Sequence, residues 1–216
     1  MIKLINGDSL NIMKEINTTN AVIVTDPPFN IGYKYGTYKD NKKECEYYKW
    51  LNDILGNIPT VIIHYPESLH KYSIERGKAP EKVISWVYNS NTAKQHRDIA
   101  FYDIKLDLRK VGQQYKNPTD KRIAKRIAER KMARLYDWWN VNQVKNVSKN
   151  HSHPCQMPEK VMENILGILP SNMTVIDPFL GSGSTGLACK KLNIEFIGIE
   201  IDEEYFDIAK KRIDET

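Results

Sequence analysis

Cysteine is scarce in this sequence, and no apolar run is long enough to span a membrane. The 216 residues include three cysteines, Cys45, Cys155 and Cys189, an odd number at scattered positions. A disulfide framework is therefore excluded, and free thiols are typical of a reducing compartment. The first residues lead directly into a predicted strand and lack the apolar core of a signal peptide. These absences predict a cytoplasmic protein with no membrane partner.

Metal ligands at zinc spacing are also missing. His151, His153 and Cys155 alternate, but no second pair of ligands stands at the spacing of a structural zinc site. The sequence has no internal repeat and no low-complexity linker. A chain of this length can bury one full core. We therefore expect a single domain over residues 1–216 and no metal.

The most informative segment is Asp26-Pro27-Pro28-Phe29. It follows the apolar run 21–25, which predicts a buried parallel strand. An acid at the carboxyl end of such a strand lies where α/β sheets bind ligands. The prolines fix the backbone, so the carbonyls of Asp26 and Pro27 have set directions. The segment suits a planar ring that carries an amino group, although an ordinary strand-to-loop turn is an alternative.

A second segment, near the C-terminus, runs from a strand through a glycine-rich loop into a helix. The strand begins at Thr174 and ends at Asp177, and the loop spans Gly181 to Gly186. The glycines allow the backbone to approach a ligand closely. The next predicted strand, 195–200, ends at Glu200, whose carboxylate can accept hydrogen bonds from a ribose diol.

A dinucleotide site is the alternative for this second segment. Gly181, Gly183 and Gly186 fit the pattern G-x-G-x-x-G. Asp177 disfavours it, because a carboxylate repels a pyrophosphate and attracts a cationic sulfonium or ammonium group. A P-loop is excluded more firmly, since the loop is not followed by Lys and Ser or Thr.

Both segments are similar to motifs of one enzyme family. Asp26-Pro27-Pro28-Phe29 resembles the catalytic motif of the DNA amino-methyltransferases that modify adenine N6 or cytosine N4. Residues 177–183 with Glu200 resemble the S-adenosylmethionine loop of the same families. The catalytic motif comes first, as in the permuted β-class. The resemblance implies a Rossmann-like α/β fold, a doubly wound mixed sheet with circularly permuted motif order. It also implies an inserted basic target-recognition region over residues 90–150.

The resemblance implies a role for each residue of the first motif. Asp26 and the Pro27 carbonyl would accept the two N–H bonds of the target amine, and Phe29 would stack on a base flipped out of the duplex. Methyl transfer would then be a direct displacement. Asp at the first position is more similar to the adenine-N6 members than to the cytosine-N4 members. The catalytic candidates are Asp26, Pro27, Pro28 and Phe29.

Cofactor contacts follow from the same resemblance, which implies S-adenosylmethionine. Asp8 ends the first predicted strand and matches an acid near the cofactor adenine, with a plain helix cap as the alternative. Residues 153–160 resemble an element, His-Pro-x-Gln-x-Pro-Glu, that contacts the methionine end. The cofactor candidates are Asp8, Gln156, Pro158, Lys160, Asp177, Phe179, Gly181, Gly183 and Glu200.

One triplet in that element points to a different chemistry. Pro154-Cys155-Gln156 matches the nucleophile motif of the cytosine-C5 methyltransferases, which attack the base with a thiolate. Here the triplet precedes the cofactor loop, whereas the C5 family has it after the loop. Asp26-Pro27-Pro28-Phe29 would also be unexplained, so we expect Cys155 to fill a variable position.

Positive charge is concentrated between the two motifs. The net charge is +5, and residues 109–134 carry ten Lys or Arg against two acids. Residues 119–134 predict a capped amphipathic helix with Ile123 and Ile127 on its apolar side. A charged face is usually only a solvated face. Its place between the motifs favours contact with DNA phosphates. The DNA-binding candidates are Lys121, Arg122, Lys125, Arg126 and Arg130.

Other features have two interpretations each. The loop 30–43 contains three tyrosines and is either a lid or an ordinary surface loop. Trp138 and Trp139 are expected to be packing anchors. His64 ends a predicted strand, and a satisfied core histidine is its default. DNA is the implied partner, and a homodimer is a common assembly of the family.

Two rival functions remain from the sequence. One is an RNA or protein amide methyltransferase on the same sheet, whose signal would be Asn at position 26. The other is a catalytically silent DNA-binding module of this fold, which the intact Asp26, Pro27 and Gly183 disfavour.

Overall fold

The structure is a computed structural model that describes residues 1–144 and 156–215. The predictions for His151, His153 and Cys155 lie outside the described residues. No helix of the described chain combines the length and the apolar character that crossing a bilayer requires.

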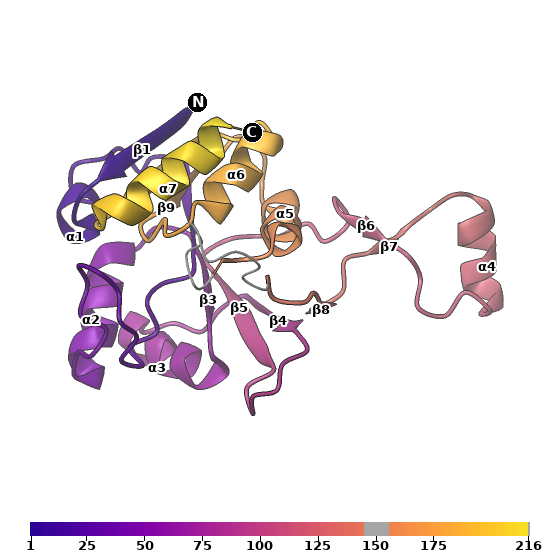
Figure 1. The fold of residues 1–216 in the computed structure, drawn as a ribbon. Helices are drawn as coiled ribbons and strands as arrows, with labels where there is room; N and C mark the ends of the chain where they lie inside the picture. Colours follow the sequence, from indigo (N-terminus) through magenta and orange to yellow (C-terminus); the bar gives the residue numbers. More distant parts are fainter. Residues whose placement is uncertain (145–155, 216) are drawn as a thin grey trace.

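A large mixed sheet forms the centre of the molecule (Figure 1). Its strand order is β1-β10-β9-β2-β3-β5-β4-β8. The first five strands in this order run parallel, and β5 is antiparallel to both of its neighbours. The bounds are β1 Ile2–Asn6, β2 Ala21–Thr25, β3 Thr60–His64, β4 Lys82–Val87, β5 His96–Tyr102, β8 Trp138–Asn140, β9 Thr174–Asp177 and β10 Phe196–Glu200.

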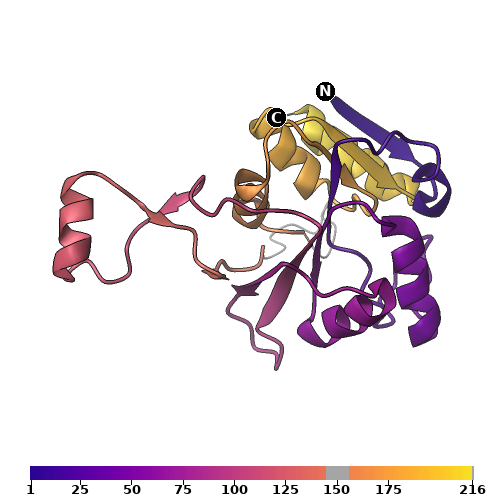
Figure 2. The ribbon, with the colours of Figure 1, turned by 180° about the vertical axis from the view of Figure 1, so that it is seen from behind.

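Helices cover both faces of this sheet (Figures 1 and 2). One layer consists of α1 Ser9–Ile12, α2 Glu44–Leu55 and α3 Pro66–Arg76, and the other of α5 Glu159–Ile168, α6 Ser184–Lys191 and α7 Glu203–Asp214. The strand β2 shows why both layers are needed. Val22 and Val24 join the core cluster under α5 and α6, whereas Ile23 joins the cluster under α2. A strand buried on both faces is continuously apolar, and the predicted doubly wound α/β fold is confirmed.

The strand order brings the two sequence motifs together. β2 and β9 are neighbours in parallel register, with Ile23 opposite Ile176. The motif that follows β2 and the loop that follows β9 therefore leave the sheet at the same edge. Ligands of open α/β sheets bind outside this edge.

A slender arm projects from the sheet and carries the basic helix at its tip (Figures 1 and 2). The arm contains β6 Gly112–Gln113, α4 Lys121–Ala128 and β7 Ala133–Arg134, and β6 pairs with β7. The predicted helix 119–134 is therefore too long. Arg130 has a left-handed φ of 56°, which ends the helix and turns the chain back toward β6.

Two further expectations need correction. The range 90–150 is not wholly an insert, because β5 and β8 belong to the main sheet and Ile104 and Leu135 between them are part of the main core. Trp139 is a packing anchor at 4% exposure, but Trp138 is 45% exposed and lies under the ammonium group of Lys116. Alternation along β8 directs the two rings to opposite faces.

Candidate active site

Two adjoining cavities lie at the carboxyl edge of the sheet. Their volumes are about 220 and 160 Å³. Both are lined by Asp26, Tyr35, Phe179 and Gly181, so the cavities meet at these side chains. The two sequence motifs thus line a cleft made of two adjoining cavities, although about 150 positions separate them in the chain.

The first cavity has acidic and aromatic walls. Glu200 accepts hydrogen bonds from the backbone N–H of Gly181 at 2.8 Å and of Asp202 at 3.0 Å. Burial raises the pKa of Glu200, and these two backbone bonds act in the opposite direction. Asp8 caps α1 by accepting the N–H of Leu10, and it also lines the cavity, so the contact with the cofactor adenine stays a prediction beside the observed helix cap.

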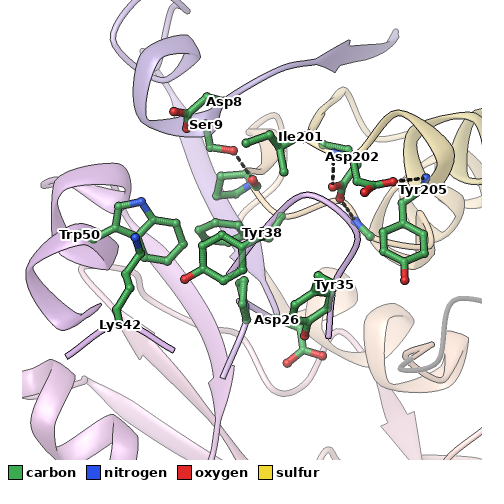
Figure 3. A pocket seen from close by; sticks show the side chains of 15 residues that line it. Asp8, Ser9, Asp26, Tyr35, Tyr38, Lys42, Trp50, Ile201, Asp202 and Tyr205 are labelled. Atoms are coloured by element: carbon green, nitrogen blue, oxygen red, sulfur yellow. Dashed lines mark hydrogen bonds between the residues drawn. The ribbon is translucent and has the colours of Figure 1, made fainter. Parts of the chain in front are cut away.

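The loop 30–43 crosses the first cavity. Figure 3 shows this loop, with Tyr35 and Tyr38, passing between Trp50 and Asp202. The backbone N–H and the hydroxyl of Thr37 both donate to Asp202, at 3.1 and 2.8 Å. Tyr38 stacks on Trp50 with 5.4 Å between ring centroids. These contacts favour the prediction that the loop covers the cleft.

The second cavity is built around Asp26. One carboxylate oxygen, Oδ2, accepts from the guanidinium of Arg97 at 3.3 Å. The other oxygen, Oδ1, is buried and has no hydrogen-bond partner among the described residues. Burial raises the pKa of Asp26 to about 6, while Arg97 acts to lower it and Asp177 to raise it further. Asp26, which lines the cavity, therefore keeps one buried acceptor that the described protein does not use, and its charge depends on its neighbours.

A hydrogen-bonded chain supports the motif from below. The backbone N–H of Tyr65 donates to Nδ1 of His64, so the neutral ring carries its proton on Nε2. Nε2 lies 3.0 Å from the hydroxyl of Tyr47, which donates to the Pro28 carbonyl at 2.6 Å. Phe29 stacks on His64 with 4.4 Å between centroids. Burial lowers the pKa of His64 to about 3, so the ring is neutral.

Asp177 holds the two halves of the site together. Its carboxylate accepts from the hydroxyls of Thr25 at 2.8 Å and Thr185 at 2.7 Å, and from the N–H of Phe179 at 3.1 Å. Both oxygens are therefore engaged by the protein itself. Asp177 lines the second cavity, but these bonds make it a link between β2, β9 and α6. The cofactor contact of Asp177 stays a prediction, and the hydrogen bonds show an internal structural role beside it.

The glycines of the loop have distinct tasks. Gly181 has a left-handed φ of 51° and lines both cavities. Gly183, at φ 79°, begins α6 and lines neither. A Cβ at Gly183 would lie 3.0 Å from the Cβ of Ala209. Gly183 therefore shapes the turn and lets α7 pack closely.

The remaining candidates are placed less uniformly. Pro27, Pro28, Phe29 and Phe179 line the cleft. Gln156 and Pro158 line neither cavity, and Lys160 is exposed to solvent. Their neighbours Met157 and Met162 line the second cavity instead. The basic candidates are all exposed, on the arm and away from the cleft (Figure 1): Lys121, Arg122, Lys125, Arg126 and Arg130.

Three contributors to the cleft were missed in the sequence. Arg97 arrives on β5, whose antiparallel pairing with β3 no local pattern predicts. Tyr47 and Trp50 lie on α2: Tyr47 donates a hydrogen bond to the Pro28 carbonyl, and Trp50 lines the first cavity. For Trp50 and Tyr47, the proximity of α2 to the loop 30–43 was a usable signal. For Arg97 the sequence carries none.

The fold and the cleft define a class of protein: a doubly wound α/β protein with two adjoining cavities at the carboxyl edge of its sheet. One cavity is lined by the glycine loop and Glu200, and the other is built around Asp26. The chain belongs to the DNA methylase family described by the N6_N4_Mtase model, which matches residues 57–211. The predicted family of adenine-N6 or cytosine-N4 DNA methyltransferases is thereby confirmed.

Individual relatives extend over nearly the whole chain. The type II methyltransferase M.HpaI of Haemophilus parainfluenzae is 29% identical over 240 residues, covering 98% of this chain and 74% of that protein. The DNA adenine methyltransferase YhdJ of Escherichia coli K12 is 26% identical over 248 residues, covering 98% of this chain and 82% of that one.

Solved structures show the same architecture. The complex of M1.HpyAVI with SAM is 25% identical, with a TM-score of 0.65, over 99% of this chain and 100% of that one. The cytosine-N4-specific PvuII DNA methyltransferase is 16% identical, with a TM-score of 0.69, over 98% of this chain and 86% of that one. The PvuII likeness concerns the fold.

Proposed function

We propose that this DNA methyltransferase transfers the methyl group of S-adenosylmethionine to N6 of adenine in a short DNA target. Membership of the DNA methylase family gives the enzyme class and the cofactor. The observation that carries the assignment to an amine is Asp26 Oδ1, a buried acceptor with no hydrogen-bond partner among the described residues, at the junction of two cavities. An N–H group of the base would satisfy it.

The first cavity fits the cofactor chemically. S-adenosylmethionine carries a planar adenine, a ribose diol and cationic sulfonium and ammonium groups. Trp50 and Phe179 offer aromatic surface for the adenine, Glu200 offers acceptors for the diol, and Asp8 and Asp202 add negative charge. When bound, the cofactor supplies an electrophilic methyl group.

The second cavity then acts on the base. Asp26 and the Pro27 carbonyl accept the amine hydrogens, which draws electron density onto the nitrogen. The side chains of Phe29 and Tyr65 offer aromatic surface to a flipped base. The chain His64–Tyr47–Pro28 keeps the motif in place, so orientation contributes to the rate.

Adenine is favoured over cytosine by the first residue of the motif. Asp26 is similar to the adenine-N6 members, and the relative YhdJ is named a DNA adenine methyltransferase. Incubation with labelled S-adenosylmethionine and unmethylated plasmid, followed by nucleoside analysis, should yield N6-methyladenine. Detection of N4-methylcytosine instead would identify cytosine as the target base. Label found only in RNA or protein would reject the proposal. Bound DNA without label would identify a silent module.

Target recognition is assigned to the arm within residues 90–150. Its helix α4 buries none of its side chains, and the five basic candidates are exposed to solvent, where they can meet phosphates; Arg122 would do so while paired with Asp120. The arm is small, so the target should span a few base pairs. Footprinting of the wild type against an arm-deleted variant tests this assignment.

Assembly and location complete the proposal. A homodimer is the expected assembly, and exposed apolar side chains on the arm, Ile127 and Met132, are available for it. If light scattering shows one species with the mass of a single chain, the homodimer is rejected. Because the substrate is cellular DNA, we propose a cytoplasmic location, which fractionation tests.

A further inference from the structure

Arg97 is a buried cation at the site that no sequence pattern predicted. It lies on β5 at 9% exposure and lines the second cavity. Its guanidinium donates to Oδ2 of Asp26 at 3.3 Å. The carbon Cζ lies 4.6 Å from the ring centroid of Phe29 and 5.5 Å from that of Trp86. The guanidinium therefore touches both the acid and the aromatic ring of the Asp26-Pro27-Pro28-Phe29 motif.

We propose that Arg97 is a positioning residue for methyl transfer: it holds Asp26 by one oxygen and leaves the other free to accept the target amine. The inference rests on the proposed function and deepens it. A bidentate pair would occupy both oxygens. The observed pair is monodentate, since Oδ1 has no partner within the described chain. The ion pair thus fixes the carboxylate without blocking it.

Arg97 also supplies the only opposing charge among the described groups that face Asp26. Asp177, on β9, raises the pKa of Asp26. His64, on β3, is neutral because burial lowers its pKa to about 3. Tyr47 on α2 and Tyr88, just after β4, have raised pKa values and are uncharged near neutrality. Loss of Arg97 would leave a buried acid beside a second acid, and Asp26 would keep its proton to higher pH.

A protonated Asp26 cannot do the proposed work. The neutral acid presents a donor where the amine needs an acceptor. The guanidinium is suited to its place because it remains charged throughout the accessible pH range and packs flat against aromatic rings. Lysine would restore charge but not the planar contact with Phe29. Replacing Arg97 with Met removes the charge, and replacing it with Lys keeps the charge but not the planar shape, so the two variants separate these contributions.

The test is the pH dependence of methylation in Arg97→Met and Arg97→Lys. Initial rates are measured from pH 5 to 9.5 at saturating DNA and S-adenosylmethionine, on whichever base the wild type labels. On the acid side of the profile the rate rises with pH, and we call this rise the acid limb. In Arg97→Met we expect the midpoint of the acid limb to move upward by about 1–3 pH units, with activity recovered at alkaline pH. Arg97→Lys keeps the positive charge, so its acid limb should stay within about half a pH unit of the wild-type position. Cofactor affinity, measured by calorimetry, should change less than about threefold because the first cavity is intact.

Arg76→Met is the matched control. The side chain of Arg76 is buried like that of Arg97, and its Nη2 lies 2.9 Å from Oδ2 of Asp103. Its Cζ lies 5.3 Å from the ring centroid of Tyr102. It lines neither cavity, so its loss should lower stability and leave the acid limb in place.

An Arg97→Met enzyme with the wild-type limb would overturn the inference, whatever its absolute rate. A limb that moves equally in Arg76→Met would overturn it as well. If Arg97→Met does not fold, Arg97→Gln takes its place: Gln is also uncharged, so its acid limb should move upward in the same way, and a wild-type limb would contradict a role based on charge. Failure of the proposed function is distinct, because it would appear in the wild type as another methylated product or none.

Discussion

Replacing Asp26 with Asn should remove most methyl transfer and leave cofactor binding nearly intact. The two side chains have nearly the same shape, so the cavity is preserved. What is lost is the negative charge on Oδ1, the buried acceptor that the amine is proposed to use. A hydrogen bond to a charged group contributes about 1.5–3 kcal/mol. Removal of one preorganised electrostatic contact lowers kcat by about 100- to 1000-fold. We expect a loss within this range.

Single-turnover methylation separates this effect from product release. The variant and the wild type are compared at saturating cofactor and DNA, and cofactor affinity is measured independently by calorimetry. Asp53→Asn serves as the control, because Asp53 is an exposed carboxylate on α2 outside both cavities. The control should keep wild-type rates. The Asp26→Asn affinity for cofactor should stay within about threefold, or about 0.7 kcal/mol.

The pH profile gives a second measure of the same residue. The pKa of Asp26 is raised to about 6, so the ionised acceptor forms as pH rises through about 6. The wild-type rate should increase over that range and then level off. Asp26→Asn has no carboxyl group at this position and should lack the limb. A wild-type rate in Asp26→Asn, or a flat wild-type profile between pH 5 and 8, would refute the role of Asp26.

Three other predictions concern stability and DNA binding. Asp177→Ala should lower the free energy of unfolding by about 1–3 kcal/mol in urea titrations, because the donors that converge on its carboxylate lose their acceptor. His64 has a folded-state pKa of about 3 against 6.5 when unfolded, so its contribution to stability holds above pH 6.5 and falls as pH drops. Between pH 6.5 and 5 the free energy of unfolding should therefore fall by about 2 kcal/mol less in His64→Gln than in the wild type. Paired Lys125→Gln and Arg126→Gln should reduce the salt slope of DNA binding by about 2, and an unchanged slope would contradict phosphate contact.

The central parts of the site could be predicted because they are local. A continuous apolar strand followed by an acid and two prolines fixes β2 and Asp26, and a strand followed by glycines fixes β9 and Gly181. The order of these segments then predicts that the two motifs share one sheet edge. Each step uses residues that are adjacent in sequence, which is where propensity and turn chemistry act.

The rest of the site depends on contacts between distant segments. Arg97 reaches Asp26 because β5 inserts antiparallel beside β3, and no repeat within His96–Tyr102 reveals that register. The end of α4 was missed for a different reason. Arg130 adopts a left-handed conformation that favours Gly or Asn, so the sequence carried no stop signal there. No local pattern predicted the internal role of Asp177, because its hydroxyl donors, Thr25 and Thr185, come from other elements of the fold.

The arm has a consequence for how such enzymes diverge. Its helix α4 contributes no buried side chain, so the stability of the catalytic body does not depend on which residues that helix presents. Most substitutions that threaten a protein do so by unfolding it, and exposed positions largely escape this penalty. If the arm recognises the target as proposed, changes of DNA sequence preference can accumulate at its tip while the methyl-transfer chemistry stays under separate selection.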